Sequence, residues 1–129
     1  MVKHVIPVSL LCAFALFAGG CGGGNMLDVQ SPFSTASQNA TLDSVTRTII
    51  TASAFKGWKP AIAGAGHIIA TRRHSGRMAK VDITFDTASF NITYLDSDNM
   101  QYDGKSISSV YHQWVDGLRD EIKTRLSQL

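Results

Sequence analysis

The sequence predicts an α+β domain over residues 41–129, in which two helices pack on one face of a three-stranded antiparallel meander in the order α-β-β-β-α. Two observations predict this class. An amphipathic helical pattern lies at each end of the range, and between them two short runs alternate between apolar and polar residues. A sheet with one apolar face and two helices with one apolar stripe each can bury these surfaces together when both helices cover that face.

The first expected element is a helix from Thr41 to Lys56. Asn39 or Thr41 can act as its N-cap, and Gly57 ends it. Residues 58–60, which include a proline, then break the helical pattern. The apolar residues that define one face of this helix are Leu42, Val45, Ile49, Ala52 and Phe55.

Three strands are expected next. The first, from His67 to Arg73, has the weakest pattern, and a turn at residues 74–77 follows it. The other two strands alternate clearly, and the short turn at residues 86–89 joins them into an antiparallel hairpin with one face in water. Their apolar positions are Ala79, Val81, Ile83 and Phe85, and then Phe90, Ile92 and Tyr94.

The last element is the strongest helical pattern, and it runs from Ser106 as N-cap to the C-terminus. One apolar stripe follows its whole length, and Glu121 and Arg125 form an i,i+4 pair of favourable orientation. The residues expected to share one core are Val81, Ile83, Phe85, Ile92, Trp114, Leu118 and Ile122.

Residues 1–20 have the pattern of a signal peptide. Lys3 gives a basic start, and an apolar run over residues 5–17 follows it. That run has about 13 residues and contains a proline, so it is too short to cross the roughly 30 Å hydrocarbon core as a helix. Small residues at positions 18–20 stand directly before Cys21, as they do at a cleavage site.

The small residues before Cys21 resemble the lipobox of bacterial lipoproteins, in which the cysteine is lipidated on its thiol and becomes the mature N-terminus. Ala18 departs from that pattern, which usually has Leu there. The resemblance implies a lasting lipid anchor, such as palmitate, because two or more acyl chains hold a protein stably on a membrane. Gly22, in place of an Asp, implies sorting to the outer membrane. The alternative is an ordinary signal peptide that leaves a soluble periplasmic protein.

Residues 21–40 are rich in Gly, Ser, Asn and Gln and show no apolar periodicity. They are predicted to contain the lipidated Cys21 and a flexible linker, with an end-to-end reach of roughly 20–25 Å. The chain is therefore expected to divide into a signal peptide over residues 1–20, an anchor with its linker over residues 21–40, and a single domain over residues 41–129.

The composition excludes several classes of function. The chain has 12 Lys and Arg against 10 Asp and Glu, a balance that gives no nucleic-acid footprint. Cys12 leaves with the signal peptide, so Cys21 alone can form neither an intrachain disulfide nor a thiolate metal site. The spacing of His67, His74 and His112 is not that of metal ligands, and neither a metal nor a cofactor is expected.

Two further stretches carry a resemblance to a known family. They are a Ser-x-Asn-x-x-Tyr loop over residues 97–102 and a Tyr-His-x-Trp helix start over residues 111–114. Together with the alternating runs, they resemble a family of small bacterial outer-membrane lipoproteins of uncharacterised function. The resemblance covers about residues 41–126. It implies a lipid-anchored domain on the outer membrane and carries no catalytic residue across.

A cluster of positive charge around the turn after the first strand is the candidate interaction surface. One interpretation is a turn solvated by water. The other is contact with anionic lipid headgroups, lipopolysaccharide phosphates or an acidic partner, since guanidinium groups bind phosphate through two parallel hydrogen bonds. The residues concerned are Arg72, Arg73, Arg77 and Lys80, with His74 beside them.

The sequence therefore favours a non-enzymatic accessory or interaction module, anchored by lipid on the bacterial outer membrane and facing the periplasm. Its partner is expected to be an envelope protein or an anionic lipid. A periplasmic carrier of a small ligand or lipid, with a pocket between helices and sheet, is the alternative. A cell-envelope hydrolase is the third hypothesis, and the sequence offers it no recognisable nucleophile, acid pair or metal set.

Overall fold

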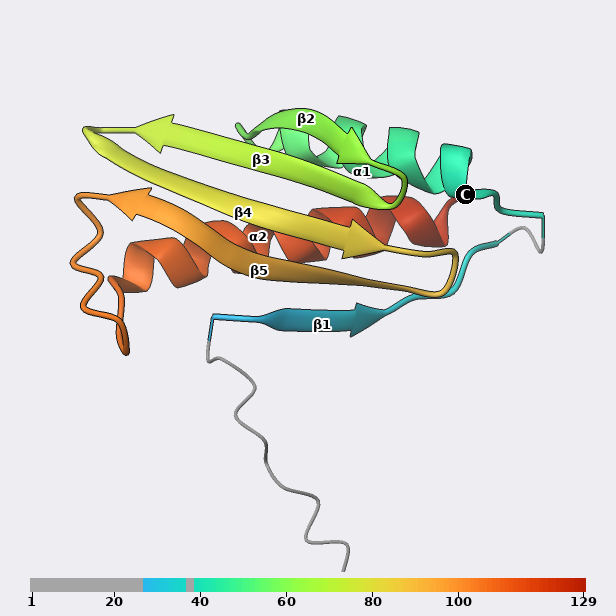
Figure 1. The fold of residues 1–129 in the computed structure, drawn as a ribbon. Helices are drawn as coiled ribbons and strands as arrows, with labels where there is room; N and C mark the ends of the chain where they lie inside the picture. Colours follow the sequence, from blue (N-terminus) through green and yellow to red (C-terminus); the bar gives the residue numbers. More distant parts are fainter. Residues whose placement is uncertain (1–26, 37–38) are drawn as a thin grey trace, which may run out of the picture.

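The computed structural model describes residues 27–36 and 39–129. They form one five-stranded antiparallel sheet in the order β1-β5-β4-β3-β2, and both helices lie on the same face of it (Figure 1). The elements are β1 Val29–Pro32, α1 Leu42–Phe55, β2 Lys59–Gly64, β3 His67–His74, β4 Arg77–Phe85, β5 Ser89–Asp98 and α2 Ser109–Ser127.

The predicted three-stranded meander is wrong, because the sheet has a further strand at each edge. β1 lies inside residues 21–40, the range predicted as anchor and linker, and β2 begins inside the proline-containing break at residues 58–60. Neither strand carries a usable pattern. β1 has only four residues, and β2 is exposed or partly exposed at every position. The fold remains a mixture of α and β elements with both helices on one side of the sheet.

Pairing with the central strands holds both edge strands in place. β1 is in register with β5 from Val29 opposite Ile92 to Pro32 opposite Ser89. β2 pairs with β3, and its Pro60 is compatible with an edge strand because one side of such a strand has no neighbour. These edge strands form because β5 and β3 have backbone hydrogen-bonding groups available for a further neighbour. A pattern of apolar and polar residues within the edge strand itself does not show this.

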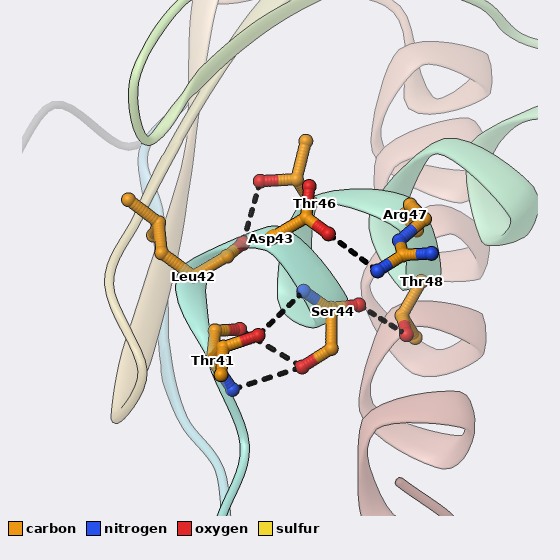
Figure 2. Close-up of polar contacts among 7 residues, drawn as sticks. All are labelled: Thr41, Leu42, Asp43, Ser44, Thr46, Arg47 and Thr48. Atoms are coloured by element: carbon orange, nitrogen blue, oxygen red, sulfur yellow. Dashed lines mark hydrogen bonds and ion pairs between the residues drawn. The ribbon is translucent and has the colours of Figure 1, made fainter.

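The first turn of α1 confirms the predicted start of that helix (Figure 2). The Thr41 hydroxyl accepts the Ser44 backbone N–H at 3.1 Å, and the Ser44 hydroxyl accepts the Thr41 N–H at 2.9 Å. This capping box satisfies two backbone donors that a helix start leaves free. Asp43 adds a negative charge near the positive end of the helix dipole and pairs with Arg47.

The predicted hairpin forms between β4 and β5, with Ile83 opposite Ile92 on the side that faces the helices. Asp86 shapes its turn, because its carboxylate accepts the backbone N–H groups of Ala88 at 2.7 Å and Ser89 at 2.8 Å. These hydrogen bonds favour the charged form and lower the pKa of Asp86.

α2 begins two residues later than predicted, at Ser109, because its N-cap is Ser108 and not Ser106. Ser106, the predicted cap, belongs to a tight loop instead. Its backbone N–H and its hydroxyl donate to the Asp103 carboxylate at 2.7 and 3.1 Å. The hydrogen bonds between Ser106 and Asp103 compete with capping by Ser106, so the helix starts further along the chain.

One core lies between the sheet and the two helices. Phe85 and Trp114 were expected inside it, but both are only partly buried and pack against its rim. Leu27 and Met100, which no pattern singled out, are buried in it. Five of the expected residues are fully buried in this core: Val81, Ile83, Ile92, Leu118 and Ile122.

Candidate functional site: the open face of the sheet

The two helices leave one face of the sheet uncovered, and we name it the open face; Figure 1 looks onto it. Side chains alternate between the two faces along a strand, so the residues between the core positions belong to this face. On β3, β4 and β5 they are mostly polar: His67, Thr71 and Arg73, then Lys80, Asp82 and Thr84, then Asn91, Thr93, Asp96 and Asp98.

The basic cluster predicted from the sequence is divided by the fold. Arg73 and Lys80 lie on the open face, and Arg73 is exposed. Arg77 lies at the β3–β4 turn, where it lines a surface hollow of about 360 Å³ together with Arg73 and Asp98. Arg72 is opposite the buried Ala79 and therefore points to the helix side.

Arg72 connects three elements on the helix side. Its Nη1 donates to the carbonyl of Lys56, the C-cap of α1, at 2.8 Å. Its guanidinium also lies 4.6 Å from the ring centroid of Trp114 on α2, and Trp58 meets that ring edge-on at 6.4 Å. The positive charge of Arg72 is stabilised both by the negative end of the α1 dipole and by the face of the Trp114 ring. Arg72 is therefore a structural residue and not part of the candidate surface.

Lys59 on β2 adds a positive charge to the open face that the sequence analysis did not include. It is directly opposite Thr71, which is itself opposite Lys80, so a single row across three strands reads Lys59, Thr71, Lys80. Arg73 follows two residues after Thr71 on the same face, within reach of long side chains. We name Lys59, Arg73 and Lys80 the basic triad.

Among the described residues, no member of the basic triad forms an ion pair within 4 Å. Gly57, Lys59, Thr71 and Arg73 line a hollow of about 260 Å³ beside it. Two ammonium groups, a guanidinium and a hydroxyl all donate hydrogen bonds. The arrangement can accept a compact anion such as a phosphate group.

The opposite side of the open face is acidic. Asp96 lies opposite Lys80 on β5, and Asp98 lies two residues further along that strand. Between the two ends, His67 Nε2 and Asp82 Oδ1 form a hydrogen-bonded pair at 2.7 Å. The face therefore carries the basic triad on β2, β3 and β4 and acidic residues on β5, and the two charges meet where Lys80 lies opposite Asp96.

The sequence missed Lys59 because it stands beside Pro60 in a stretch that reads as a break. No local signal could have placed it in one row with Lys80, which is 21 residues away in the chain and two strands away in the sheet. In the described residues, no group of three or more His, Cys, Asp or Glu side chains could hold a metal ion.

The predicted lipidation site, Cys21, and the predicted signal peptide lie outside the described residues. In residues 27–36 and 39–129, no helix is both long and apolar enough to span a bilayer. Compared with models of protein families, with curated proteins and with solved structures, the chain gives no match.

Proposed function

We propose that this protein is a lipid-anchored, non-enzymatic interaction module of the bacterial envelope, held on the outer membrane through Cys21 and facing the periplasm. The uncovered sheet face with the unpaired basic triad is the observation that carries the proposal. A face with this charge pattern favours an anionic partner. The hollow lined by Lys59, Thr71 and Arg73 offers several hydrogen-bond donors to a compact anion, such as the phosphate group of an envelope lipid.

A lipid anchor suits such a surface. Tethering keeps the domain near the membrane, so a partner in the same layer is met at a high effective concentration. Each contact of the triad with an anionic surface then contributes only about 1 kcal/mol and is screened by salt. Binding is therefore specific through the arrangement of the three cations rather than through any single one.

The anchor is tested at Cys21. Cys21→Ala should abolish fatty-acid labelling and block cleavage by the lipoprotein-specific peptidase, because the thiol is the acylated atom. Cys12→Ala is the matched control, since that cysteine lies in the apolar run and should label as the unmodified chain does. Labelling of the Cys21→Ala protein, or wild-type protein found entirely in the soluble periplasm, would refute the anchor.

The open face is tested by crosslinking in cells. A photo-reactive amino acid in place of Thr71 should capture a phosphorylated envelope lipid such as lipopolysaccharide, whereas one in place of the exposed Thr124 on α2 should not. Lys59→Glu combined with Arg73→Glu should reduce the capture about tenfold or more, because two contacts of about 1 kcal/mol each are lost.

The control for this charge reversal is Lys105→Glu combined with Lys123→Glu, which changes the net charge equally at exposed positions away from the open face. That pair should leave the capture unchanged. An equal loss in both double variants would reveal a non-specific effect of net charge and contradict the proposed surface. Capture of a single protein instead of a lipid would keep the surface and replace the partner.

A further inference from the structure

The chain enters the domain close to the proposed anchor. Leu27 is 3% exposed and belongs to the core, and β1 begins two residues later at Val29, where it pairs with β5. Only residues 22–26, which we name the tether, therefore separate Cys21 from the first buried residue. At about 3.5 Å per residue, the six steps from Cys21 to Leu27 cannot exceed roughly 21 Å, and Gly-rich chains of this length typically span about 12–15 Å.

The basic triad lies within a comparable distance of this entry point. β1 is one edge of the sheet, and Lys80, Arg73 and Lys59 lie on the second, third and fourth strands from it (Figure 1). Neighbouring strands are about 4.8 Å apart, so these cations are roughly 10, 14 and 19 Å from β1 across the sheet. A domain that lies with its open face on the membrane therefore keeps the triad at the surface within the reach of the tether.

Other orientations lose this contact. If the β1 edge faced the membrane, Lys59 and Arg73 would be lifted roughly 14–19 Å from it, beyond the Debye length of about 8 Å at physiological ionic strength. The two helices carry Arg47, Arg119 and Arg125 on the other side of the domain, and each of these pairs with a carboxylate. A cation without an ion pair loses no protein partner when it meets a headgroup phosphate, so charge complementarity favours the open face.

Acidic residues on the same face limit the affinity of the triad for a free anion. Asp96 lies opposite Lys80, and Asp98 lines the hollow at the β3–β4 turn together with Arg73 and Arg77. These carboxylates weaken the attraction of a dissolved phosphate. A short tether offsets this loss, because it raises the effective concentration of the surface to which the domain is attached. The surface that the triad binds best is therefore the one that carries the anchor.

We propose that the domain lies with its open face on the membrane leaflet that holds its own anchor, and that the basic triad contacts the phosphates of anionic phospholipids in that leaflet. This inference rests on the proposed function and deepens it, because it names the partner and the orientation of the domain. The phosphate belongs to the anchoring leaflet and not to an opposing surface.

The test measures how close the open face comes to the lipid surface. The full lipidated protein carries a nitroxide at Ala61→Cys on the open face, or at Thr124→Cys on α2 as the control, in vesicles that contain a nickel-chelating lipid. Because Cys21 is acylated and Cys12 leaves with the signal peptide, each variant offers one free thiol. With phosphatidylglycerol present, the label at position 61 should collide with the nickel headgroups far more often than in phosphatidylcholine alone. The label at position 124 should show no such difference.

Two changes separate this arrangement from other contacts. Twenty Gly and Ser residues inserted after Gly24 lengthen the chain from six to twenty-six steps and should lower the ratio of contacting to detached domains about ninefold, since effective concentration falls with the three-halves power of length. Lys59→Glu combined with Arg73→Glu should lower that ratio about tenfold or more. The control pair Lys105→Glu with Lys123→Glu should leave it unchanged.

The outcomes distinguish this inference from the proposed function. Contact that the longer tether does not weaken, or contact only with a second population of phosphatidylglycerol vesicles that carries no protein, would overturn the inference and keep the anion-binding surface. An absence of contact with either population would overturn both. Protein that does not sediment with phosphatidylcholine vesicles would refute the anchor and the inference with it.

Discussion

Phe90→Ala should lower the free energy of unfolding by about 3–5 kcal/mol, the range measured for removing a buried aromatic ring from a core. Phe90 is 1% exposed and lies in β5, with its ring 6.2 Å from that of Phe33. β5 is also the strand that pairs with both β4 and β1. A cavity at this position therefore loosens the centre of the sheet and the N-terminal edge strand together.

Urea unfolding measures this effect, and a shifted midpoint with an unchanged slope identifies a loss of native-state stability. Asn91→Ala is the matched control, because Asn91 is the next residue of β5 and belongs to the open face. It should change stability by less than about 0.5 kcal/mol, as surface substitutions usually do. Equal destabilisation by both substitutions would show that the assigned faces of β5 are wrong.

Arg72→Glu should destabilise the domain by about 2–4 kcal/mol, while Arg73→Glu should stay within about 0.5 kcal/mol. The first substitution removes a charged donor from the Lys56 carbonyl and a cation from the Trp114 ring. It also places a negative charge at the negative end of the α1 dipole. The second reverses a charge that has no ion-pair partner among the described residues.

Thermal and urea unfolding of the two variants check this contrast, which compares neighbouring residues with the same charge change. Arg72→Gln adds a neutral step and should fall between wild type and Arg72→Glu. An Arg72→Glu protein as stable as wild type would contradict the structural role of Arg72 and would indicate that its side chain is exposed to solvent. The contrast also shows why charge reversal of the basic turn has to spare Arg72 if the domain is to stay folded.

The helices and the central hairpin could be predicted because their patterns are local. The N-cap Thr41 directly precedes α1, and its capping partner Ser44 is in the first turn of that helix. The alternation of β4 and β5 depends only on which side of each strand is apolar. The later start of α2 could not be predicted, because Ser106 and Ser108 are equally good caps and only the loop contacts of Asp103 choose between them.

The edge strands and the composition of the candidate site could not be predicted in the same way. β1 is too short to show a period, and β2 shows no alternation between apolar and polar residues after Lys59. Arg72 and Arg73 are adjacent in the chain yet point to opposite faces, so a count of basic residues groups them wrongly. For Cys21 the sequence is the only source of information. The lipobox resemblance rests on the sequence, and Cys21 lies outside the described residues.

By itself the sequence determined the mixture of two amphipathic helices with an alternating hairpin, and which side of that hairpin is apolar. Only the tertiary structure decided that the sheet has five strands, that Lys59 joins Arg73 and Lys80, and that Tyr94, Tyr102 and Tyr111 meet. The physical reason is the range of each interaction. Periodicity and capping act within a few residues, whereas strand pairing at a sheet edge and neighbours across strands join residues that are distant in the chain.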